Sequence, residues 1–426
     1  MKNRRNFIKQ IIAVAALAPV VYWGKISMSG KTVYPASDHY DPAKKIFFNA
    51  RPIPPMKDIS VGKWYDLFFN NQVGPQSPLP TLKPDWGDFL APHAEAKFIW
   101  FGHSCLMARL GGQTLIFDPV FGDHVSPLPI VMKRFQPPPA ALNELPPVDA
   151  VVITHNHYDH LEKSSIRFFA KQNSRFIVPP GLAAALQDWG VPAERIQELD
   201  WWQSATAGDV QITATPARHN SGRGFFDGNK SLWNGYVFEY QGRRFYNSGD
   251  GAFDSHFAAV KQRLGDFDIA FIENGQYSDY WFTHMRPEET VRAAQIIAAQ
   301  RFMPIHWGMY PLSFHKWNEP MRQSVPLARE KGLNPLTPIL GEVFDKHTAS
   351  RDWWDREQTR ASLALRKNIF KSGISANAKE QNASNLARHF QKRKKTAFCR
   401  VAVFLPWICA GRRANRPGGH GTGAHP

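Results

Sequence analysis

Residues 154–160 hold four side chains of the kinds that bind metal ions in proteins: His155, His157, Asp159 and His160. An apolar, β-branched run, residues 148–153, comes directly before them and predicts a buried strand. The four side chains therefore lie on a loop that leaves the carboxyl end of a strand, where a rigid scaffold can direct them to one place. Imidazole and carboxylate together suit zinc and also tolerate iron or manganese.

Three further candidates follow short apolar runs later in the chain, and these are His219, Asp250 and His306. Gly249 allows the backbone to turn tightly just before Asp250. Each residue alone is typical of a surface or hydrogen-bonded position. The repetition of one pattern, an apolar run followed by a potential ligand, four times in order, predicts that these residues bind metal together.

The order and spacing of these residues resemble the metallo-β-lactamase superfamily. Within it, the chain is similar to the branch of N-acyl-phosphatidylethanolamine-hydrolysing phospholipase D over roughly residues 45–345. The segments that carry this likeness are residues 100–104 (WFGHS), 117–121 (FDPVF), 133–139 (KRFQPPP), 144–149 (ELPPVD), 198–202 (ELDWW) and 305–308 (IHWG).

The resemblance implies an α/β fold, the αββα four-layer sandwich, with metals where the strand-end loops gather. The sequence agrees independently, because short apolar runs alternate with helical stretches such as residues 287–297, which have Pro and acidic residues in their first turn. We expect residues 30–360 to form this single hydrolase domain.

The resemblance also implies a role for each candidate. His155, His157 and His219 bind one metal, Asp159, His160 and His306 bind the other, and Asp250 bridges them. Two Zn²⁺ are expected, with Fe or Mn as alternatives. Asp159, Asp250 and His284 are the expected catalytic residues, and His284 contacts the phosphate or assists the leaving group.

The expected reaction is hydrolysis of a phosphodiester, that of an N-acylated phosphatidylethanolamine or a similar phospholipid, by a metal-bound hydroxide. A second hypothesis is a metal-dependent hydrolase of a carboxylic ester, lactone or β-lactam, because the same centre attacks acyl carbon. A third is a non-catalytic metal-binding surface protein.

Some neighbouring residues carry weaker expectations. His103 and Ser104 are interpreted as strand-end hydrogen bonders rather than partners of the metal ligands, and Asp118 as structural or a partner of a ligand. Many aromatic side chains surround the later ligands, and for most of them the core is expected rather than an acyl-chain groove. Residues 46–69 are apolar and rich in Pro, and they either wrap the domain or meet lipid.

The two ends differ from the body of the chain. Residues 1–29 resemble a twin-arginine export signal, with Arg4 and Arg5 before a short apolar run, and we expect a protein that is exported in bacteria to the periplasm, either released there or held by this segment as an anchor. Residues 361–426 hold 13 Lys and Arg and one Glu, and this composition predicts a disordered basic tail.

The net charge of +16 therefore comes from the ends, and residues 11–360 are electrically balanced. A balanced body makes nucleic acid an unlikely partner, while a small molecule or phospholipid and a membrane surface remain candidates. A homodimer stays open. Cys105 is expected to be buried, and the three cysteines show neither metal nor redox spacing.

Overall fold

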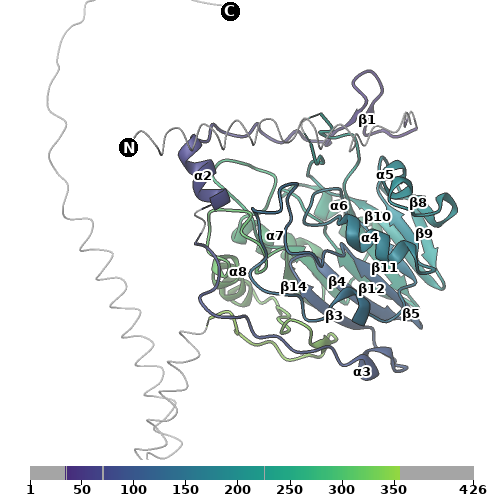
Figure 1. The fold of residues 1–426 in the computed structure, drawn as a ribbon. Helices are drawn as coiled ribbons and strands as arrows, with labels where there is room; N and C mark the ends of the chain where they lie inside the picture. Colours follow the sequence, from purple (N-terminus) through teal and green to yellow (C-terminus); the bar gives the residue numbers. More distant parts are fainter. Residues whose placement is uncertain (1–33, 35, 70–71, 225, 356–426) are drawn as a thin grey trace, which may run out of the picture. The chain divides into compact units, whose positions relative to one another are not determined.

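The computed structural model describes residue 34 and residues 36–69, 72–224 and 226–355. The predicted export signal and basic tail lie outside these residues, so both remain predictions. Two β-sheets packed face to face, with helices on both outer sides, make up the described body (Figure 1). The predicted αββα four-layer sandwich is confirmed.

The first sheet has seven strands in the order β15-β3-β4-β5-β6-β7-β8. Their bounds are β3 Lys97–Gly102, β4 Cys105–Leu110, β5 Gln113–Phe117, β6 Ala150–Val152, β7 Arg175–Val178, β8 Ile196–Glu198 and β15 Val343–Phe344. Strands β5 to β8 pair in parallel, and the pairs β15–β3, β3–β4 and β4–β5 are antiparallel.

The second sheet has six strands in the order β14-β13-β12-β11-β10-β9. Their bounds are β9 Ser204–Ala207, β10 Val210–Pro216, β11 Asn234–Tyr240, β12 Arg243–Asn247, β13 Ile269–Glu273 and β14 Arg301–Ile305. Strands β12, β13 and β14 are parallel to one another, and β9, β10, β11 and β12 form antiparallel pairs.

Helices cover the outer face of each sheet. The helices α4 (Lys163–Ala170) and α5 (Ala183–Asp188) share a buried apolar cluster with the seven-stranded sheet. On the other side, a second buried apolar cluster joins the six-stranded sheet to α6 (His256–Leu264), α7 (Pro287–Ile297) and α8 (Glu319–Glu330). The bounds of α7 are those that the sequence predicts, because Pro287 and the two following acids favour a helix start.

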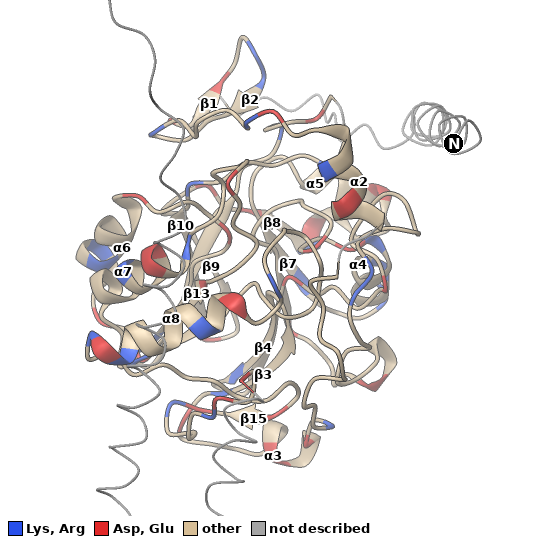
Figure 2. Cartoon of the chain, turned by 90° about the vertical axis from the view of Figure 1, so that its left-hand side faces the viewer, with Lys and Arg blue, Asp and Glu red and all other residues tan. Residues whose placement is uncertain are grey.

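The remaining elements are short. They are the hairpin β1 (Tyr40–Asp41) and β2 (Ile46–Phe47), the helices α2 (Val61–Phe69) and α3 (Trp86–Leu90), and the single turns η1 (Leu142–Glu144) and η2 (Ala193–Arg195). Segments with Lys or Arg and segments with Asp or Glu are both scattered over the view in Figure 2.

The largest core lies between the sheets and contains apolar side chains from both. Phe98 of β3, for example, contacts the rings of Phe238, Phe245 and Phe271 in the other sheet. Such aromatic pairs add roughly 0.5–1.5 kcal/mol each beyond the area that they bury. This core fixes the two sheets against each other, and it therefore fixes the loops that meet at their shared edge.

Candidate metal centre

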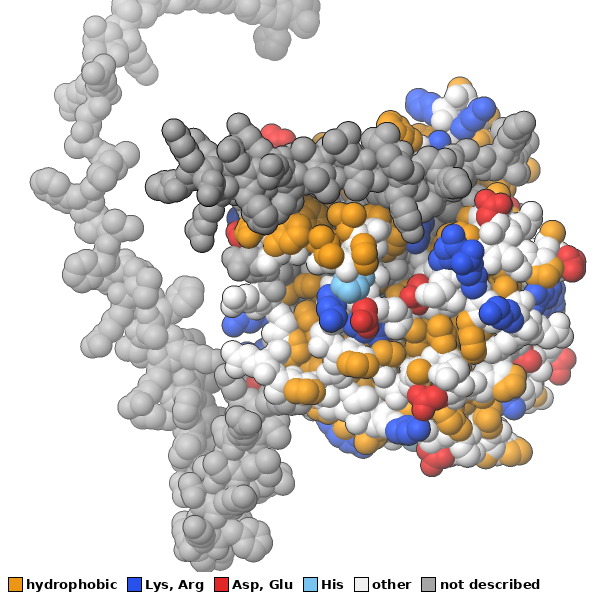
Figure 3. Space-filling view, in the orientation of Figure 1, with side chains coloured by type: hydrophobic (Ala, Val, Ile, Leu, Met, Phe, Trp, Pro, Cys, Tyr) orange, Lys and Arg blue, Asp and Glu red, His pale blue; other side chains and the backbone are white. Residues whose placement is uncertain are grey.

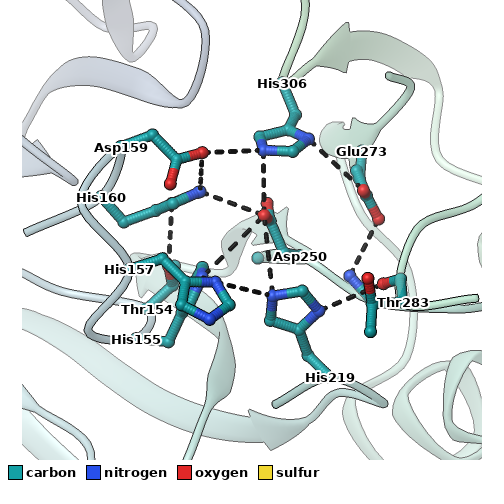
Figure 4. A network of polar contacts seen from close by, with 12 residues as sticks. Thr154, His155, His157, Asp159, His160, His219, Asp250, Glu273, Thr283 and His306 are labelled. Carbon is teal, nitrogen blue, oxygen red and sulfur yellow. Dashed lines mark hydrogen bonds and ion pairs between the residues drawn. The ribbon is translucent and has the colours of Figure 1, made fainter. Parts of the chain in front are cut away.

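All the predicted metal-binding side chains follow strands that run in one direction. His155 follows β6, His219 follows β10, Asp250 follows β12 and His306 follows β14; Asp118, which is expected to be structural or to support a ligand, follows β5. The pairing pattern gives β5 and β6 one direction in the first sheet, and β10, β12 and β14 one direction in the second. The carboxyl ends of these strands meet at one edge of the sandwich, where Figure 4 shows the side chains facing a common centre.

Local backbone geometry contributes to this convergence. His103, Asp118 and His306 adopt positive φ values of 54°, 44° and 66°, which are costly for residues with a Cβ and occur often at functional sites. Gly249 turns the chain at φ 58°, and a Cβ there would lie 2.4 Å from the carbonyl oxygen of Asn234. The bulky loop residues are thus aimed inward by strained turns at the strand ends.

One half of the centre consists of three histidines, His155, His157 and His219, here called the three-histidine half. The Nδ1 atom of His157 lies 2.9 Å from Nε2 of His155 and 3.2 Å from Nε2 of His219. Tetrahedral zinc with Zn–N bonds of 2.0–2.1 Å needs nitrogens roughly 3.3 Å apart. Burial lowers the pKa of His157 to about 4 and the pKa values of the other two well below the usual value, so all three are neutral at pH 7, as ligands must be.

The other half, here called the carboxylate-rich half, consists of Asp159, His160 and His306. The Oδ2 atom of Asp159 lies 3.3 Å from Nε2 of both histidines. Burial works against the charged form of these histidines, but Asp250 and Asp159 outweigh it and raise the pKa of each well above the usual value. In the absence of a cation, protons on the histidines therefore balance the carboxylates.

Asp250 lies between the two halves. Its Oδ2 atom is 2.9 Å from Nε2 of His306 and 3.0 Å from Nε2 of His160, and it is 3.9 Å from Nε2 of both His155 and His219. Burial raises its pKa, but His160 and His306 outweigh burial and hold the pKa well below the usual range. An ionised carboxylate in this position reaches both halves at once.

The orientation of these atoms fits metal ions better than mutual hydrogen bonds. Nε2 of His160 and both carboxylate oxygens of Asp250 are buried and have no hydrogen-bond partner, although Nε2 of His160 lies 3.0 Å from Oδ2 of Asp250. Uncompensated buried polar atoms are rare in folded proteins. Atoms that point at a shared position instead of at each other are arranged as ligands, so the donor set fits divalent cations.

Behind the ligands, a layer of polar residues fixes the imidazole rings. Asp118 accepts hydrogen bonds from the amide and hydroxyl of Thr154, at 2.8 and 2.7 Å, and from Nδ1 of His160 at 2.7 Å. The Thr154 hydroxyl in turn lies 3.0 Å from Nδ1 of His155. With each Nδ1 engaged, Nε2 is left to face the centre. Asp118 has the supporting position that the sequence predicts.

Arg223 holds the loop of residues 154–160 from outside. Its guanidinium donates to the carbonyl oxygens of Asn156 at 2.9 Å and Leu161 at 2.7 Å, and it lies 3.7 Å from the ring centre of Tyr158. On the other side, Asn49 accepts the amide hydrogen of His219 at 3.1 Å and donates to its carbonyl oxygen at 2.7 Å. Segments distant in sequence thus fix both parts of the three-histidine half.

The interpretation of His103 as a simple strand-end hydrogen bonder is wrong. Its Nε2 atom lies 2.8 Å from Oδ2 of Asp159, and its ring is 4.2 Å from that of His306. The positive φ that follows Gly102 turns this side chain inward, and a single sequence does not reveal such a turn. His103 therefore belongs to the carboxylate-rich half as a partner of Asp159.

Sequence analysis did not identify Glu273, the last residue of β13. It is fully buried and contacts His284 and His306. The apolar run before it, Ile269–Ile272, is the same signal that identified His219 and His306, so the pattern was available. The side chain of His284 is 14% exposed. The centre of its ring lies 5.1 Å from the ring centre of His219 and 5.0 Å from that of His306.

The aromatic residues near the centre divide into two groups. Trp233, Tyr277 and Tyr310 are buried, as expected for core residues. Phe226 is 87% exposed, and Tyr280, Trp281, Phe282 and Phe314 are partly exposed. Cys105 is buried at the start of β4, as expected.

Comparisons with known proteins agree with this architecture. Residues 113–307 match the family model described as a beta-lactamase superfamily domain. The chain is 36% identical over 288 residues to an uncharacterized protein of Mycobacterium tuberculosis, covering 66% of this chain and 77% of that protein. It is 33% identical over 290 residues to N-acyl-phosphatidylethanolamine-hydrolyzing phospholipase D 1 of Caenorhabditis elegans, covering 63% and 81%.

A third relative is the mitochondrial N-acyl-phosphatidylethanolamine-hydrolyzing phospholipase D of Saccharomyces cerevisiae. It is 31% identical over 261 residues, which cover 58% of this chain and 55% of the yeast protein. The matched family model spans the loops that carry His155, His157, Asp159, His160, His219, Asp250 and His306.

Proposed function

We propose, from the premise that the chain belongs to the beta-lactamase superfamily of metal-dependent hydrolases, that its substrate is a phosphodiester and that two zinc ions occupy the centre. The expected substrate is an N-acylated phosphatidylethanolamine or a similar phospholipid. Two relatives named as phospholipases of this specificity support the substrate class.

The observation that carries this proposal is the position of His284. It is the one histidine around the centre that neither half uses as a ligand and that is still partly exposed, among the residues that the structure describes. Its Nδ1 atom contacts Glu273 and lies 3.9 Å from Asp250. A group beside the metal ligands and open to solvent is placed to meet the substrate rather than to hold the metal.

The chain's own residues divide the work of hydrolysis. Two divalent cations, when bound, lower the pKa of water and stabilise negative charge on phosphate oxygens. The residues of the two halves and Asp250 would hold these cations. Burial of their loops excludes water and so strengthens the electrostatic interactions at the centre. As a water oxygen forms its bond to phosphorus and releases a proton to solvent, the bond from phosphorus to the head-group oxygen breaks. His284, which then carries a proton on Nε2 as well as on Nδ1, gives its Nε2 proton to that oxygen.

A lipid substrate is supported by the surface next to His284. The helix α2 exposes Val61, Tyr65 and Phe69 by 68%, 51% and 47%, and these residues are four apart and share one face. Figure 3 shows hydrophobic side chains gathered where α2 lies in Figure 1. Exposed apolar patches of this kind mark contact surfaces.

Three contacts connect this helix and its approach to the loop that carries His284 and to the later loop that carries Phe314. The amide of Lys57 donates to the carbonyl oxygen of Tyr280 at 2.8 Å, and its ammonium lies 5.3 Å from the ring centre of Phe282. The ammonium of Lys63 lies 5.4 Å from the ring centre of Phe314. A lipid held at α2 would thus have its head group close to the centre.

The test is turnover by the metal-loaded full chain on two panels of substrates. One holds N-acylated phosphatidylethanolamine, other phospholipids and bis(p-nitrophenyl) phosphate, and the other holds lactones, thioesters and a chromogenic β-lactam. Asp250→Asn is the blank, and Asp188→Asn, on the exposed end of α5, is the matched control. We expect phosphatidic acid as a product, lost in the blank alone. Turnover of the acyl panel alone would refute the phosphodiester proposal.

We also propose export to the periplasmic side, on the basis of residues 1–29. In the described part of the chain, no helix has the length and apolar character needed to cross a membrane. Cell fractionation of the wild type and an Arg4→Lys/Arg5→Lys variant tests the proposal. Retention of the wild type in the cytoplasm would refute it.

A further inference from the structure

Glu273 is a carboxylate buried at the end of β13 with contacts to two histidines. Its Oε1 atom contacts Nδ1 of His284 and lies 3.4 Å from Nδ1 of His306. Its Oε2 atom accepts the amide hydrogen of Gly251 at 2.8 Å. Figure 4 shows the side chain of Glu273 between Thr283 and His306.

The backbone of Glu273 is fixed at both ends of the residue. Its amide donates to the hydroxyl of Ser248 at 3.0 Å, and its carbonyl oxygen accepts the hydroxyl of Thr290 at 2.8 Å. The side chain is fully buried, and burial of a carboxylate costs several kcal/mol unless polar partners compensate it. A rigid, fully enclosed carboxylate of this kind can hold its partners in one orientation.

In His306, Glu273 contacts the side of the imidazole that faces away from the centre. In His306, Nε2 lies 2.9 Å from Asp250 and 3.3 Å from Asp159, whereas Nδ1 faces Glu273. The two nitrogens of one imidazole point in different directions. Glu273 therefore lies behind the ring of His306, although it is near enough to the centre to be grouped with Asp250, His284 and His306 as a potential ligand.

We propose that Glu273 is a positioning residue that fixes His284 and His306 together. It accepts the Nδ1 hydrogen of His284, so that Nε2 of His284 and the proton that it donates face the substrate, and it braces His306 so that Nε2 faces the metal. The role assigned to His284 rests on the proposed function, but the role toward His306 does not. One carboxylate thus sets the alignment between a metal ligand and the residue that protonates the leaving group.

The first test measures orientation and metal affinity and needs no substrate. We would record ¹⁵N–¹H spectra of the histidine rings in the full-length holoenzyme for wild type, Glu273→Gln and Glu273→Ala, with His284→Ala to assign the His284 signals. Chelator competition on the same proteins measures zinc affinity. Glu198→Gln is the matched control, because Glu198 is a carboxylate that accepts backbone amides of Gly181, Leu182 and Ala183 elsewhere in the fold.

We expect wild type to show the Nδ1-protonated ring of His284 and Glu273→Ala to lose it. Zinc affinity in Glu273→Ala should fall by about 10–100-fold, the usual effect of removing a partner of a ligand. The amide oxygen of Glu273→Gln still accepts a hydrogen bond, so its affinity should stay within about tenfold of wild type. If the protonation of the histidine rings and the zinc affinity in Glu273→Ala equalled those of wild type, the proposal would be overturned. Loss of a whole metal ion in Glu273→Gln would show that Glu273 is itself a metal ligand.

The second test is a double-mutant cycle with saturating zinc on N-acylated phosphatidylethanolamine, whose alkoxide leaving group needs a proton. Glu273→Ala should lower kcat by about 10–100-fold with little change in KM in the wild-type background. In the His284→Ala background it should lower kcat by less than about twofold, because the two residues act as a unit. Equal losses in both backgrounds would overturn the role toward His284. Absence of turnover in wild type would refute the phosphodiester proposal and leave the first test intact.

Discussion

The two halves of the centre both offer ligands to a cation, but the side chains of the two halves differ in charge. The three-histidine half gathers neutral imidazoles, because burial lowers their pKa values and no carboxylate lies within hydrogen-bond distance of their facing nitrogens. The carboxylate-rich half gathers charged groups, because Asp250 and Asp159 hold protons on His160 and His306. The first half is ready for a cation, while the second must exchange protons for one.

The groups that stand behind the histidines also differ in charge between the two halves. Side-chain carboxylates, Asp118 and Glu273, stand behind His160 and His306. A backbone carbonyl oxygen, that of Thr283, lies 3.1 Å from Nδ1 of His219, and Asn49 fixes the main chain of the same residue. We therefore expect the carboxylate-rich half to respond more strongly to changes of charge and pH.

The largest effect is expected when a ligand is removed from either half. His219→Ala and His306→Ala should each retain roughly one zinc ion per chain in place of two, and each should lose more than about 100-fold in kcat/KM, beyond the effect of losing a supporting residue. Metal analysis after gel filtration and steady-state kinetics measure both quantities. His347→Ala, which alters an exposed histidine far along the chain, is the control. Loss of both ions in either variant would show that the halves do not bind independently.

A smaller effect is expected from Asp118→Asn. The amide cannot accept from Thr154 and His160 as a carboxylate does, so the ring of His160 loses its charged partner. Zinc affinity of the carboxylate-rich half should fall by about 10–100-fold, while that of the three-histidine half falls less. Titration with a competing chelator resolves the two steps. Equal weakening of both steps would mean that Asp118 supports the loop as a whole.

The pH dependence should separate the halves without a mutation. Asp250 keeps His160 and His306 protonated through their raised pKa values in the metal-free protein, so a cation that binds there releases protons. Affinity for this ion should therefore rise with pH, by about tenfold per unit for each proton released. The pKa of His157, about 4, means that the other ion displaces no proton from it near neutral pH. Calorimetry in buffers of different ionisation enthalpy counts the protons, and equal release at both steps would contradict the assignment.

The smallest effect is expected from Asn49→Ala. The backbone amide of buried His219 loses its hydrogen-bond acceptor, which costs about 1–3 kcal/mol in the free energy of unfolding. The indole N–H of Trp233 still donates to the carbonyl oxygen of Ala217. Zinc affinity should change by less than tenfold, because the ring of His219 keeps its contact with Thr283. Chemical denaturation of the metal-loaded protein measures the first quantity. A loss of metal as large as in His219→Ala would show that the hydrogen bonds of Asn49 to the main chain of His219, and not the contact of its ring with Thr283, keep this ligand in place.

Much of the fold was predictable because its signals are local. The bounds of α7 followed from Pro287 and its acidic neighbours, and the strands before His155, His219, Asp250 and His306 followed from short apolar runs. Their meeting at one edge was predicted from the family resemblance. Strand direction and pairing, which bring the two sheets' edges together, needed long-range contacts that no local run encodes.

The residues that were missed or misread share a different reason. Glu273 ends a strand like the other candidates, but its role depends on which side of His306 it meets. His103 points inward because of a positive φ that the residue type disfavours. Asn49 and Arg223 act through main-chain atoms of distant loops, and such contacts leave no spacing in the sequence.

The sequence by itself determined the types of ligand, their order along the chain and the strands that carry them, because these depend on residue chemistry and local periodicity. The family resemblance implied which candidate ligands share a half and that Asp250 lies between the halves. Only the tertiary structure decided the orientation of these side chains and which buried carboxylates stand behind the histidines. The physical reason is that orientation within a few ångströms is set by the packing of two sheets and the turns at their edges. That packing is a property of the whole folded body and not of any one segment.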